Sequence, residues 1–376
     1  MPGLVRVGGA WKTVSGISVR VGGAWKAVTG AFVRVAGVWK SWGSPPSFVA
    51  FVSPSSNSPE AYQFSGGWGA KFAAPATNAG AALWSVNFNP AKNVLAASQG
   101  SSPYTHAWNW SATGFGSKFA APGGATPGFG MADLTWSPAG TTVLSAGATG
   151  TNPLNAYNWS GGFGTRYANP VNFTTGVTGK IGWGPASNFV VIPGGSGQYS
   201  AAYNFSSGWG SKLADVFTFT NEMYSMQFNP AGNAIFSAGF PSPRLFAHAW
   251  SAGWGSKFAD PASLPPSSLV GLSVHPSGNA VMATGENATN SARLVQAWAW
   301  SNGWGSKYAD ASLASNAGTQ DTRFSSDGST VFAAGSNSPF IHAYPWSPGF
   351  GTKYANPATL PSGGGSSGYI GHVIAT

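Results

Sequence analysis

Nine acidic residues and five histidines are the side chains of this 376-residue chain that could carry acid–base or metal chemistry. Hydrolysis of a glycosidic bond needs two carboxyl groups about 5–10 Å apart. Asp133, Glu222 and Asp321 fall near expected inner strands of a repeated unit, with Lys180 and Arg323 as cationic neighbours. The acids come one per repeat and share no motif. We interpret them as polar residues of a channel wall and predict no catalytic residue.

The histidines do not show the spacing of metal ligands. His106, His248 and His342 lie in expected third strands, and His275 lies in a turn after an inner strand. No pair has the i, i+4 or short-loop spacing of a metal site, and no glycine-rich phosphate loop opens a helix. Cysteine is absent. The sequence therefore predicts no metal site, no cofactor and no nucleotide site.

The composition favours an all-β chain with many turns. Charged residues make up 7% and aromatic residues 14% of the chain, beside 54 Gly and 27 Pro. The aromatic residues argue against disorder, and the few Glu and Lys residues argue against a helical protein. No apolar run reaches the roughly 18 residues of a membrane-spanning helix, and the start lacks the apolar block of a secretory signal. We expect synthesis in a cytoplasm and no membrane insertion.

Positive charge is concentrated at the N-terminus. The net charge is +9, from 18 Lys+Arg and 9 Asp+Glu residues. Residues 1–44 hold six basic residues and no acidic one, so residues 45–376 carry a net charge of only +3. A basic segment beside a nearly neutral body indicates a negative partner, or it keeps an aromatic-rich segment soluble. We expect a protein partner here and no nucleic acid.

Three copies of a 14-residue unit occupy residues 1–44, with the pattern Val-Arg-Val-(Gly/Ala)-Gly-x-Trp-Lys. Gly-Gly between β-forming residues favours a tight hairpin, because both central positions of that turn need positive φ. In this register Arg6 faces Trp11. Ala36 in the third copy indicates a different turn type. The candidate attachment residues are Arg6, Trp11, Lys12, Arg20, Trp25, Lys26, Arg34, Trp39 and Lys40.

This unit resembles the short Val-Arg/Lys-Val-Gly-Gly-x-Trp-Lys repeats found near the ends of tailed-bacteriophage structural and tail proteins. The resemblance covers residues 1–44 and implies a virion protein, which we expect in the tail of the particle after synthesis in the host cytoplasm. We expect residues 1–44 to form a β-hairpin module that attaches the chain to other phage structural proteins. Gly43-Ser44-Pro45-Pro46 is then a linker stiffened by its prolines.

A longer repeat fills residues 45–376. A Gly-(Ser/Thr/Ala)-(Lys/Arg) phrase returns seven times, about every 47 residues, and a phrase such as Phe228-Asn229-Pro230-Ala231-Gly232-Asn233 recurs between its copies. A period of about 40–50 residues with four short strands is typical of a propeller blade. We interpret the recurring basic residues as packing over aromatic rings, with ligand or nucleic-acid contact as the alternative. They are Lys71, Lys118, Arg166, Lys212, Lys257, Lys307 and Lys353.

This longer unit resembles a WD-repeat blade, with an inner strand before the Pro-containing turn and a third strand that ends in Trp. The Trp is followed by Ser, as in Trp110-Ser111, where WD repeats have Asp, and the usual Gly-His is missing. We predict seven WD-like blades over residues 45–376. Residues 48–52 and 369–374 look like a second strand and an inner strand, so the chain ends should complete one blade and close the ring.

Variable loops supply the candidate receptor face. In a WD-like blade, the second-to-third-strand loop and the outer-to-inner connection emerge on one face. Here both are rich in Ser, Thr, Asn and Gly, which hydrogen-bond sugar hydroxyls, and they include aromatic residues that stack on sugar rings. Loops on a rigid scaffold are common sites of binding, although such loops also serve as plain connectors. The candidates are Gln99, Ser101, Asn172, Phe173, Phe219, Asn221, Phe240, Asn287 and Asn290.

Together these patterns predict a structural and interaction protein of a tailed phage, and not an enzyme. Residues 1–44 would anchor it to the particle, and the propeller would bind the host surface, with glycan favoured over protein as the receptor. One alternative is a capsid decoration or stabilising protein without receptor binding. Another is a polysaccharide-binding lectin or a propeller glycoside hydrolase, which would need aromatic–polar pockets or clustered carboxylates, respectively.

Overall fold

The chain folds into two units of β-strands. In the computed structural model these units span Met1–Ser47 and Phe48–Thr376. Side chains are described for residues 57–123, 133–147, 154–171, 179–194, 200–214, 222–240, 242–285, 295–311, 321–335 and 338–362, and the strands outside these ranges are described by their backbone. Among the described residues, no helix is long and apolar enough to cross a membrane. The predicted all-β class is confirmed.

The first unit contains three antiparallel strand pairs, each forming a separate two-stranded sheet. In every pair the arginine of the 14-residue repeat lies opposite its tryptophan, as Arg6 does with Trp11. The glycine-containing turns between paired strands lie outside the described residues. The pairs are β1 (Gly3–Val7) with β2 (Ala10–Val14), β3 (Ser18–Val21) with β4 (Ala24–Ala27), and β5 (Ala31–Val35) with β6 (Val38–Trp42).

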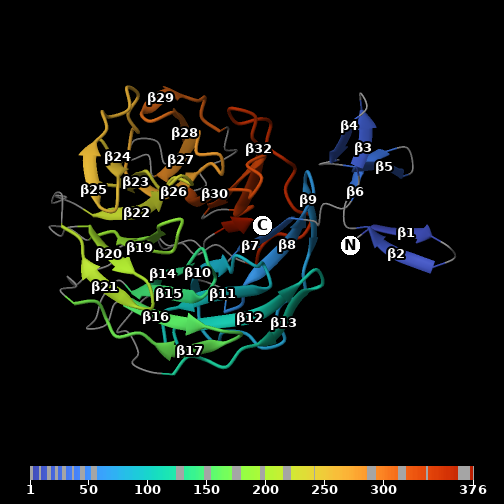
Figure 1. Ribbon diagram of the computed structural model, residues 1–376, viewed down its shortest axis with the longest axis horizontal. Coiled ribbons are helices and arrows are strands. Elements are labelled where there is room, and N and C mark those ends of the chain that lie inside the picture. Colours follow the sequence, from blue (N-terminus) through green and yellow to red (C-terminus); the bar gives the residue numbers. More distant parts are fainter. Residues whose placement is uncertain are drawn as a thin grey trace. The chain divides into compact units, whose positions relative to one another are not determined.

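The second unit is a β-propeller (Figure 1). Six of its sheets have four antiparallel strands, and one has three. The four-stranded sheets are β33 (Val373–Ala375), β7 (Ser47–Phe51), β8 (Glu60–Phe64), β9 (Trp68–Lys71); β10 (Leu83–Phe88), β11 (Val94–Gln99), β12 (Thr105–Ser111), β13 (Gly114–Lys118); β14 (Met131–Trp136), β15 (Thr142–Gly147), β16 (Leu154–Trp159), β17 (Phe163–Arg166); β18 (Gly182–Trp183), β19 (Phe189–Ile192), β20 (Ala201–Phe205), β21 (Trp209–Lys212); β22 (Met223–Phe228), β23 (Ala234–Gly239), β24 (Leu245–Trp250), β25 (Trp254–Lys257); and β26 (Leu269–Val274), β27 (Ala280–Gly285), β28 (Leu294–Trp300), β29 (Trp304–Lys307). The three-stranded sheet is β30 (Thr319–Phe324), β31 (Thr330–Gly335), β32 (Ile341–Pro345).

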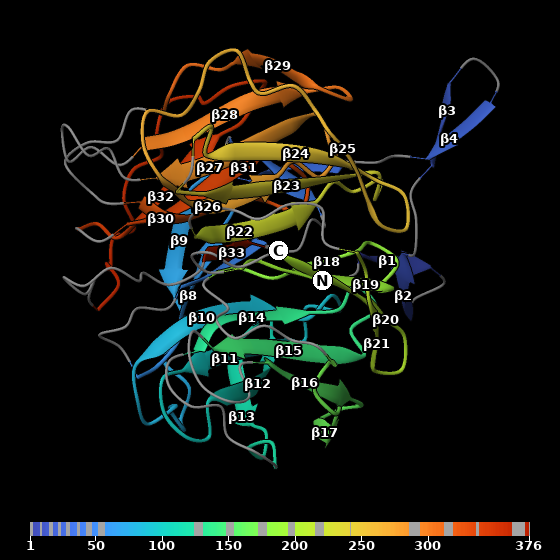
Figure 2. The same ribbon diagram turned by 90° about the vertical axis from the view of Figure 1, so that its left-hand side faces the viewer.

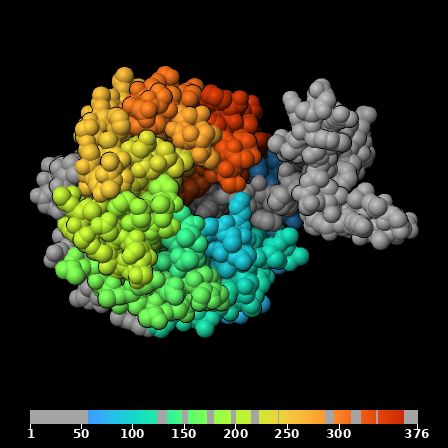
Figure 3. All heavy atoms as spheres, in the orientation of Figure 1, coloured from blue at the N-terminus to red at the C-terminus, as the bar shows by residue number. Residues whose placement is uncertain are grey.

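The sheets are arranged in a ring, with the first strand of each innermost. Figure 2 shows the strands of one sheet following one another outward, as in the series β10, β11, β12, β13. Figure 3 shows the successive sheets around the ring in the order of the sequence. The C-terminal strand β33 pairs with β7 through Val373 and Phe51, and β33 also contacts both β10 and β30. Both ends of the repeat region therefore share one sheet, and their pairing closes the ring.

The structure establishes six four-stranded blades, whereas the sequence predicts seven complete blades. The difference lies in the sheet of β30, β31 and β32, where the outer strand is reduced to an isolated bridge between Trp346 and Phe350. Pro345 immediately precedes this bridge. It has no backbone N–H to donate, and its ring lies where a Cβ at position 351 would fall, so that only glycine fits there. The count of seven blades stays a prediction.

The recurring aromatic residues form the blade cores. Trp110 at the end of a third strand packs edge-to-face against Phe88 of the inner strand, at 5.2 Å between ring centroids, and against Phe115 of the outer strand, at 4.9 Å. Trp346 packs in the same way against Phe324 and Phe350, both at 5.1 Å. Edge-to-face pairs contribute about 0.5–1.5 kcal/mol each beyond the burial of their area. These contacts explain why the third-strand tryptophan recurs.

A second set of aromatic contacts joins each blade to the next. In six of the seven repeats the residue after the recurring lysine or arginine is aromatic, leaves the outer strand and packs on the third-strand aromatic ring of the following sheet. In the fourth repeat this residue is Leu213, which packs on the cluster that contains Trp250. The centroid separations lie between 5.0 and 5.6 Å, and all of these pairs are edge-to-face. The pairs are Phe72–Trp110, Phe119–Trp159, Tyr167–Phe205, Phe258–Trp300, Tyr308–Trp346 and Tyr354–Phe64.

The turn between the first two strands of a blade requires one residue in the left-handed backbone conformation, with positive φ. Gly232 has φ of 70°, and a Cβ there would lie 3.3 Å from the Pro185 ring of the preceding blade. Lys92 occupies the same turn position in an earlier blade with φ of 57°. Glycine adopts this conformation without steric cost, which explains the Pro-x-Gly phrase of the repeat.

Candidate functional site

Polar residues on the inner strands surround a cavity of about 440 Å³ in the middle of the ring. In each inner strand these residues lie two positions apart, and side chains at that spacing point to the same face of the strand. The position before the last strand residue contributes Asn87, Thr135, Gly182, Gln227, Ser273 and Arg323. The position two residues earlier holds Ser85, Asp133, Lys180, Ser225 and Asp321, of which Lys180 and Ser225 line the cavity.

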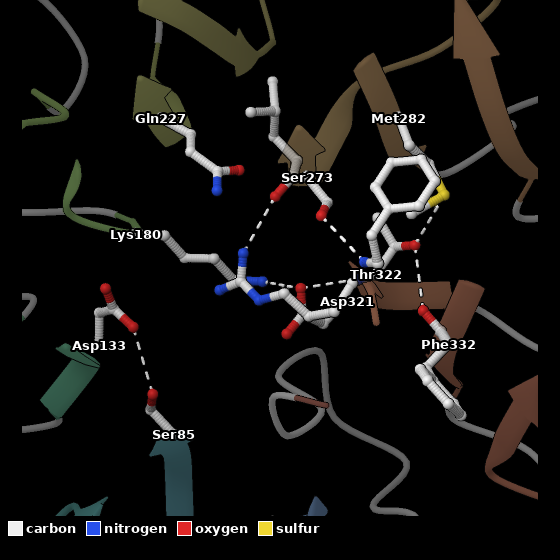
Figure 4. A network of polar contacts seen from close by, with 12 residues as sticks. Ser85, Asp133, Lys180, Gln227, Ser273, Met282, Asp321, Thr322 and Phe332 are labelled. Carbon is white, nitrogen blue, oxygen red and sulfur yellow. Dashed lines mark hydrogen bonds and ion pairs between the residues drawn. The ribbon is translucent and has the colours of Figure 1, made fainter. Parts of the chain in front are cut away.

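Lys180 and Asp321 form a buried ion pair across this region (Figure 4). Lys180 is 8% exposed and Asp321 is fully buried. Lys180 is held by backbone hydrogen bonds, its N–H donating to Tyr224 O at 2.8 Å. Burial lowers the pKa of the Lys180 ammonium, and Asp321 opposes that shift. The pair therefore joins the sheets of β18 and β30 across the ring.

Asp133 links three neighbouring sheets through its two carboxylate oxygens. Oδ1 accepts a hydrogen bond from Ser85 Oγ at 3.2 Å, and Oδ2 accepts one from Ile181 N at 2.9 Å. Burial raises the pKa of the Asp133 carboxyl, and the Ile181 hydrogen bond and Lys180 oppose that shift. Its oxygens are engaged by fixed donors, so this arrangement favours bracing of the ring over proton transfer.

The other polar inner-strand residues join one blade to the next. Gln227 Oε1 accepts a hydrogen bond from Val274 N at 3.1 Å, and Ser273 Oγ accepts one from Phe324 N at 3.2 Å. Each of these N–H groups lies at the edge of an inner strand, where the sheet itself offers no partner. Arg323 Nη1 donates to Leu272 O at 3.2 Å. Such bonds satisfy polar backbone groups that burial would otherwise leave unpaired.

The predicted group of acidic residues is brought together only in part. Asp321 pairs with Lys180, and the charges of Lys180 and Arg323 oppose the burial that raises the pKa of Asp133. Glu222 has no contact with this group in the described contacts, and none of the three acids is a lining residue of the cavity. Glu222 accepts a hydrogen bond from Tyr224 Oη at 2.5 Å. Sequence reasoning missed Ser85, Gln227 and Ser273, although each is a polar residue at an alternate position of an inner strand.

The third-strand histidines are packed inside the blades. Burial, together with smaller effects of Lys118, Lys257 and Lys353 respectively, lowers the pKa values of His106, His248 and His342 to about 4. His275 instead lies in a turn, where Nδ1 is 2.7 Å from Ser277 Oγ. Within the described part of the chain, no group of three His, Cys, Asp or Glu residues is placed to hold a metal ion.

The recurring basic residues make local contacts at the ends of the outer strands. Lys118 Nζ lies 5.6 Å from the Trp108 ring centroid and donates to Asn78 O at 2.8 Å. Lys71 pairs with Glu60 at 2.9 Å. In four other blades the partner is the residue three positions later. These contacts are Arg166–Asn169, Lys257–Asp260, Lys307–Asp310 and Lys353–Asn356. They favour the packing interpretation of this set.

The predicted receptor face carries exposed apolar side chains. Phe240 lies in a second-to-third-strand loop and is 48% exposed. Val171, Leu264 and Leu360 lie in outer-to-inner connections and are 38–76% exposed. By the antiparallel strand order, both kinds of segment lie at the same end of the blades. Among the described residues, these four are the exposed large hydrophobic side chains.

The individual receptor-face candidates differ in their placement. Ser101 is exposed, as predicted for a loop residue. Gln99 is not: it ends strand β11, is 1% exposed, and its Nε2 donates to Ser101 O at 3.0 Å. It therefore holds the loop in place and does not present its side chain. Asn172, Phe173, Phe219, Asn221, Asn287 and Asn290 lie outside the described residues, as do the side chains of the attachment candidates in residues 1–44.

No protein-family model matches the chain, and a search of curated proteins found no significant match.

Proposed function

We propose that this protein is a structural and interaction protein of a tailed-phage particle, in which the propeller binds the host surface. The observation that carries the proposal is that the exposed large hydrophobic side chains among the described residues, Phe240, Val171, Leu264 and Leu360, all lie in segments at one end of the blades. Loops held by a rigid scaffold are common sites of binding. The chemistry of the inner strands favours bracing, because their acids are engaged by Lys180, Ser85 and backbone N–H groups.

We also propose that the ring has seven blades, with the sheet of β30, β31 and β32 as the seventh. Its Trp346 has the same edge-to-face partners as the third-strand tryptophan of a complete blade. Tyr308 of the preceding blade packs on Trp346 at 5.2 Å, and Tyr354 packs on Phe64 of the following one at 5.4 Å. The isolated Trp346–Phe350 bridge stands where the outer strand pairs elsewhere.

Glycan is the favoured receptor because the surroundings of Phe240 combine aromatic and polar groups. The Phe240 ring lies 5.4 Å from the Tyr224 ring at an interplanar angle of 55°. The Tyr224 hydroxyl donates to Glu222, whose backbone carbonyl accepts from Phe240 N at 3.0 Å. An exposed ring stacks on a sugar face, and a nearby carboxylate accepts hydrogen bonds from its hydroxyls.

The test is binding of the protein to host cells. We expect Phe240→Ala combined with Leu264→Ser to weaken binding about tenfold or more, as loss of a central aromatic contact does. Ser301→Ala is the control, because Ser301 is exposed in a turn at the other end of the blades. Equal binding by the wild type, the double variant and the control would place the receptor site elsewhere and overturn the proposal.

Residues 1–44 are proposed to attach the chain to the particle. The support is their three paired strands, their six basic residues and no acidic one, and their separation from the propeller as a compact unit. Particles assembled with a chain that lacks residues 1–44 should contain little of the protein, while the truncated chain should keep the unfolding temperature of its propeller. Full occupancy of particles by the truncated chain would contradict the attachment role.

A further inference from the structure

The cavity among the inner strands has the size and the lining of a small-molecule site. Its volume of about 440 Å³ falls within the roughly 300–1,000 Å³ of ligand pockets. Asn87, Thr135, Gln227 and Ser273 contribute amide and hydroxyl groups from four different sheets, and Ser326 contributes another hydroxyl from a turn. A wall of this kind offers both hydrogen-bond donors and acceptors to one ligand.

Arg323 supplies the charge of this cavity. Its guanidinium has five N–H donors in a planar fork, and the structure gives it one hydrogen bond, from Nη1 to Leu272 O at 3.2 Å. Arg323 lines the cavity and is half-buried, so its guanidinium can offer donors to a ligand there. A partly desolvated guanidinium with open donors binds a carboxylate or phosphate through two parallel hydrogen bonds.

The neighbouring charges select a ligand with a single negative charge. Lys180, the other cation of the cavity wall, is already paired with the buried Asp321. Asp133 and Asp321 belong to the same network as Arg323. Lys92 lies outside the lining, with its Nζ 3.5 Å from Ser326 Oγ at the rim. A second negative charge inside the cavity would therefore find no second open cation in its wall, which disfavours a phosphate dianion. A carboxylate carries one charge, and hydroxyl groups beside it match the amides and hydroxyls of the wall.

We propose that the cavity binds a sugar acid, with its carboxylate on the Arg323 guanidinium and its hydroxyls on Gln227, Asn87 and Ser326. The cavity is bordered by the turns that join first and second strands, including Pro185, Pro230 and Pro276. Phe240 lies at the opposite end of β23, roughly 20 Å away for a six-residue strand. The sugar-acid site is therefore separate from the proposed receptor face and does not depend on it.

Isothermal titration calorimetry of the full chain tests this site, with D-glucuronate and N-acetylneuraminate as probes. We expect at least one of them to bind, and D-glucose and inorganic phosphate to bind at least about tenfold more weakly. Arg323→Gln should weaken sugar-acid binding about tenfold or more, because it removes a charge-assisted pair of hydrogen bonds. Arg244→Gln is the matched control, since Arg244 donates to Pro265 O at the other end of the blades, and it should leave binding unchanged.

A second variant keeps the test decisive if Arg323→Gln unfolds. Ser326 is exposed at the rim of the cavity, so Ser326→Trp should block entry and reduce binding without touching the guanidinium. The proposal is wrong if neither sugar acid binds the wild type at about 10 mM, far above the range of a specific site. It is also wrong if glucose or phosphate binds as well as the sugar acids, or if both variants bind like the wild type.

Discussion

Glu60 accepts hydrogen bonds from the backbone N–H of Ser362, 302 residues further along the chain, at 3.1 and 3.2 Å to its two carboxylate oxygens. Ser362 Oγ also donates to Glu60, and Lys71 pairs with the same carboxylate at 2.9 Å. Glu60 begins β8, in the sheet that contains both ends of the repeat region. This carboxylate therefore ties the segment that leads to the last strand onto the sheet that the last strand joins.

Removing this carboxylate should destabilise the propeller. Glu60→Ala leaves the Ser362 N–H and the Lys71 ammonium without their acceptor, so we expect a loss of about 1–3 kcal/mol in the free energy of unfolding, measured by urea denaturation. Asp260→Ala is the control, because Asp260 pairs with Lys257 in an exposed i, i+3 contact and should cost no more than about 0.5 kcal/mol. Equal losses for the two variants would show that Glu60 has no special role.

The buried histidines should make the protein less stable below about pH 6.5. Their pKa values are near 4 in the fold and 6.5 in the reference state, so the unfolded chain binds more protons between these values. Each histidine then lowers the free energy of unfolding by about 1.4 kcal/mol per pH unit as the pH falls through this window. Urea denaturation at several pH values between about 7.5 and 4.5 measures the slope.

In the third strand β28, Gln296 occupies the position that His106 and His342 occupy in their own strands, four residues before the tryptophan, and it is also buried. His106→Gln and His342→Gln should therefore fit the blades and flatten the pH dependence, each by up to one proton. An unchanged slope in the double variant would assign the acid sensitivity to other groups.

The left-handed turn position should respond in opposite directions to two substitutions. Lys92→Gly relieves a non-glycine residue at φ of 57° and should stabilise the fold by up to about 1 kcal/mol. Gly232→Ala introduces a Cβ at φ of 70°, 3.3 Å from Pro185, and should destabilise it by about 1 kcal/mol or more. Thermal unfolding compares both with the wild type, and a shift of the same sign for the two would refute the turn assignment.

The ion pair across the ring should show strong coupling. Lys180→Met leaves the buried Asp321 carboxylate without its counter-charge, and Asp321→Asn leaves the Lys180 ammonium alone, so each should cost about 3–5 kcal/mol. The double variant should cost less than the sum of the two single losses, because it leaves no unpaired buried charge. A double-mutant cycle by urea denaturation measures the coupling, and additive losses would contradict it.

The propeller class was predictable because the repeat is regular, and so was the role of its aromatic residues. The outer strand of the β30 sheet was not, because Pro345 and the neighbouring bridge alter pairing only locally. The polar network was harder to predict. Lys180 and Asp321 are 141 residues apart and meet through the curvature of the ring. The prediction that Gln99 is an exposed loop residue was wrong. A polar residue next to a loop is expected to be exposed, but strand β11 includes Gln99 as its last residue.

The contact between Tyr354 and Phe64 repeats, across the join of the chain ends, the same aromatic contact that links Phe72 to Trp110. Every repeat has a third-strand aromatic ring that receives this contact, and six of the seven also supply the ring that makes it; Leu213 takes that place in the other repeat. Whole repeats that share this contact could therefore be added or removed with few changes at the junctions, because the neighbouring repeats present matching rings. The number of blades is then limited by ring closure, because the first and last blades must still meet.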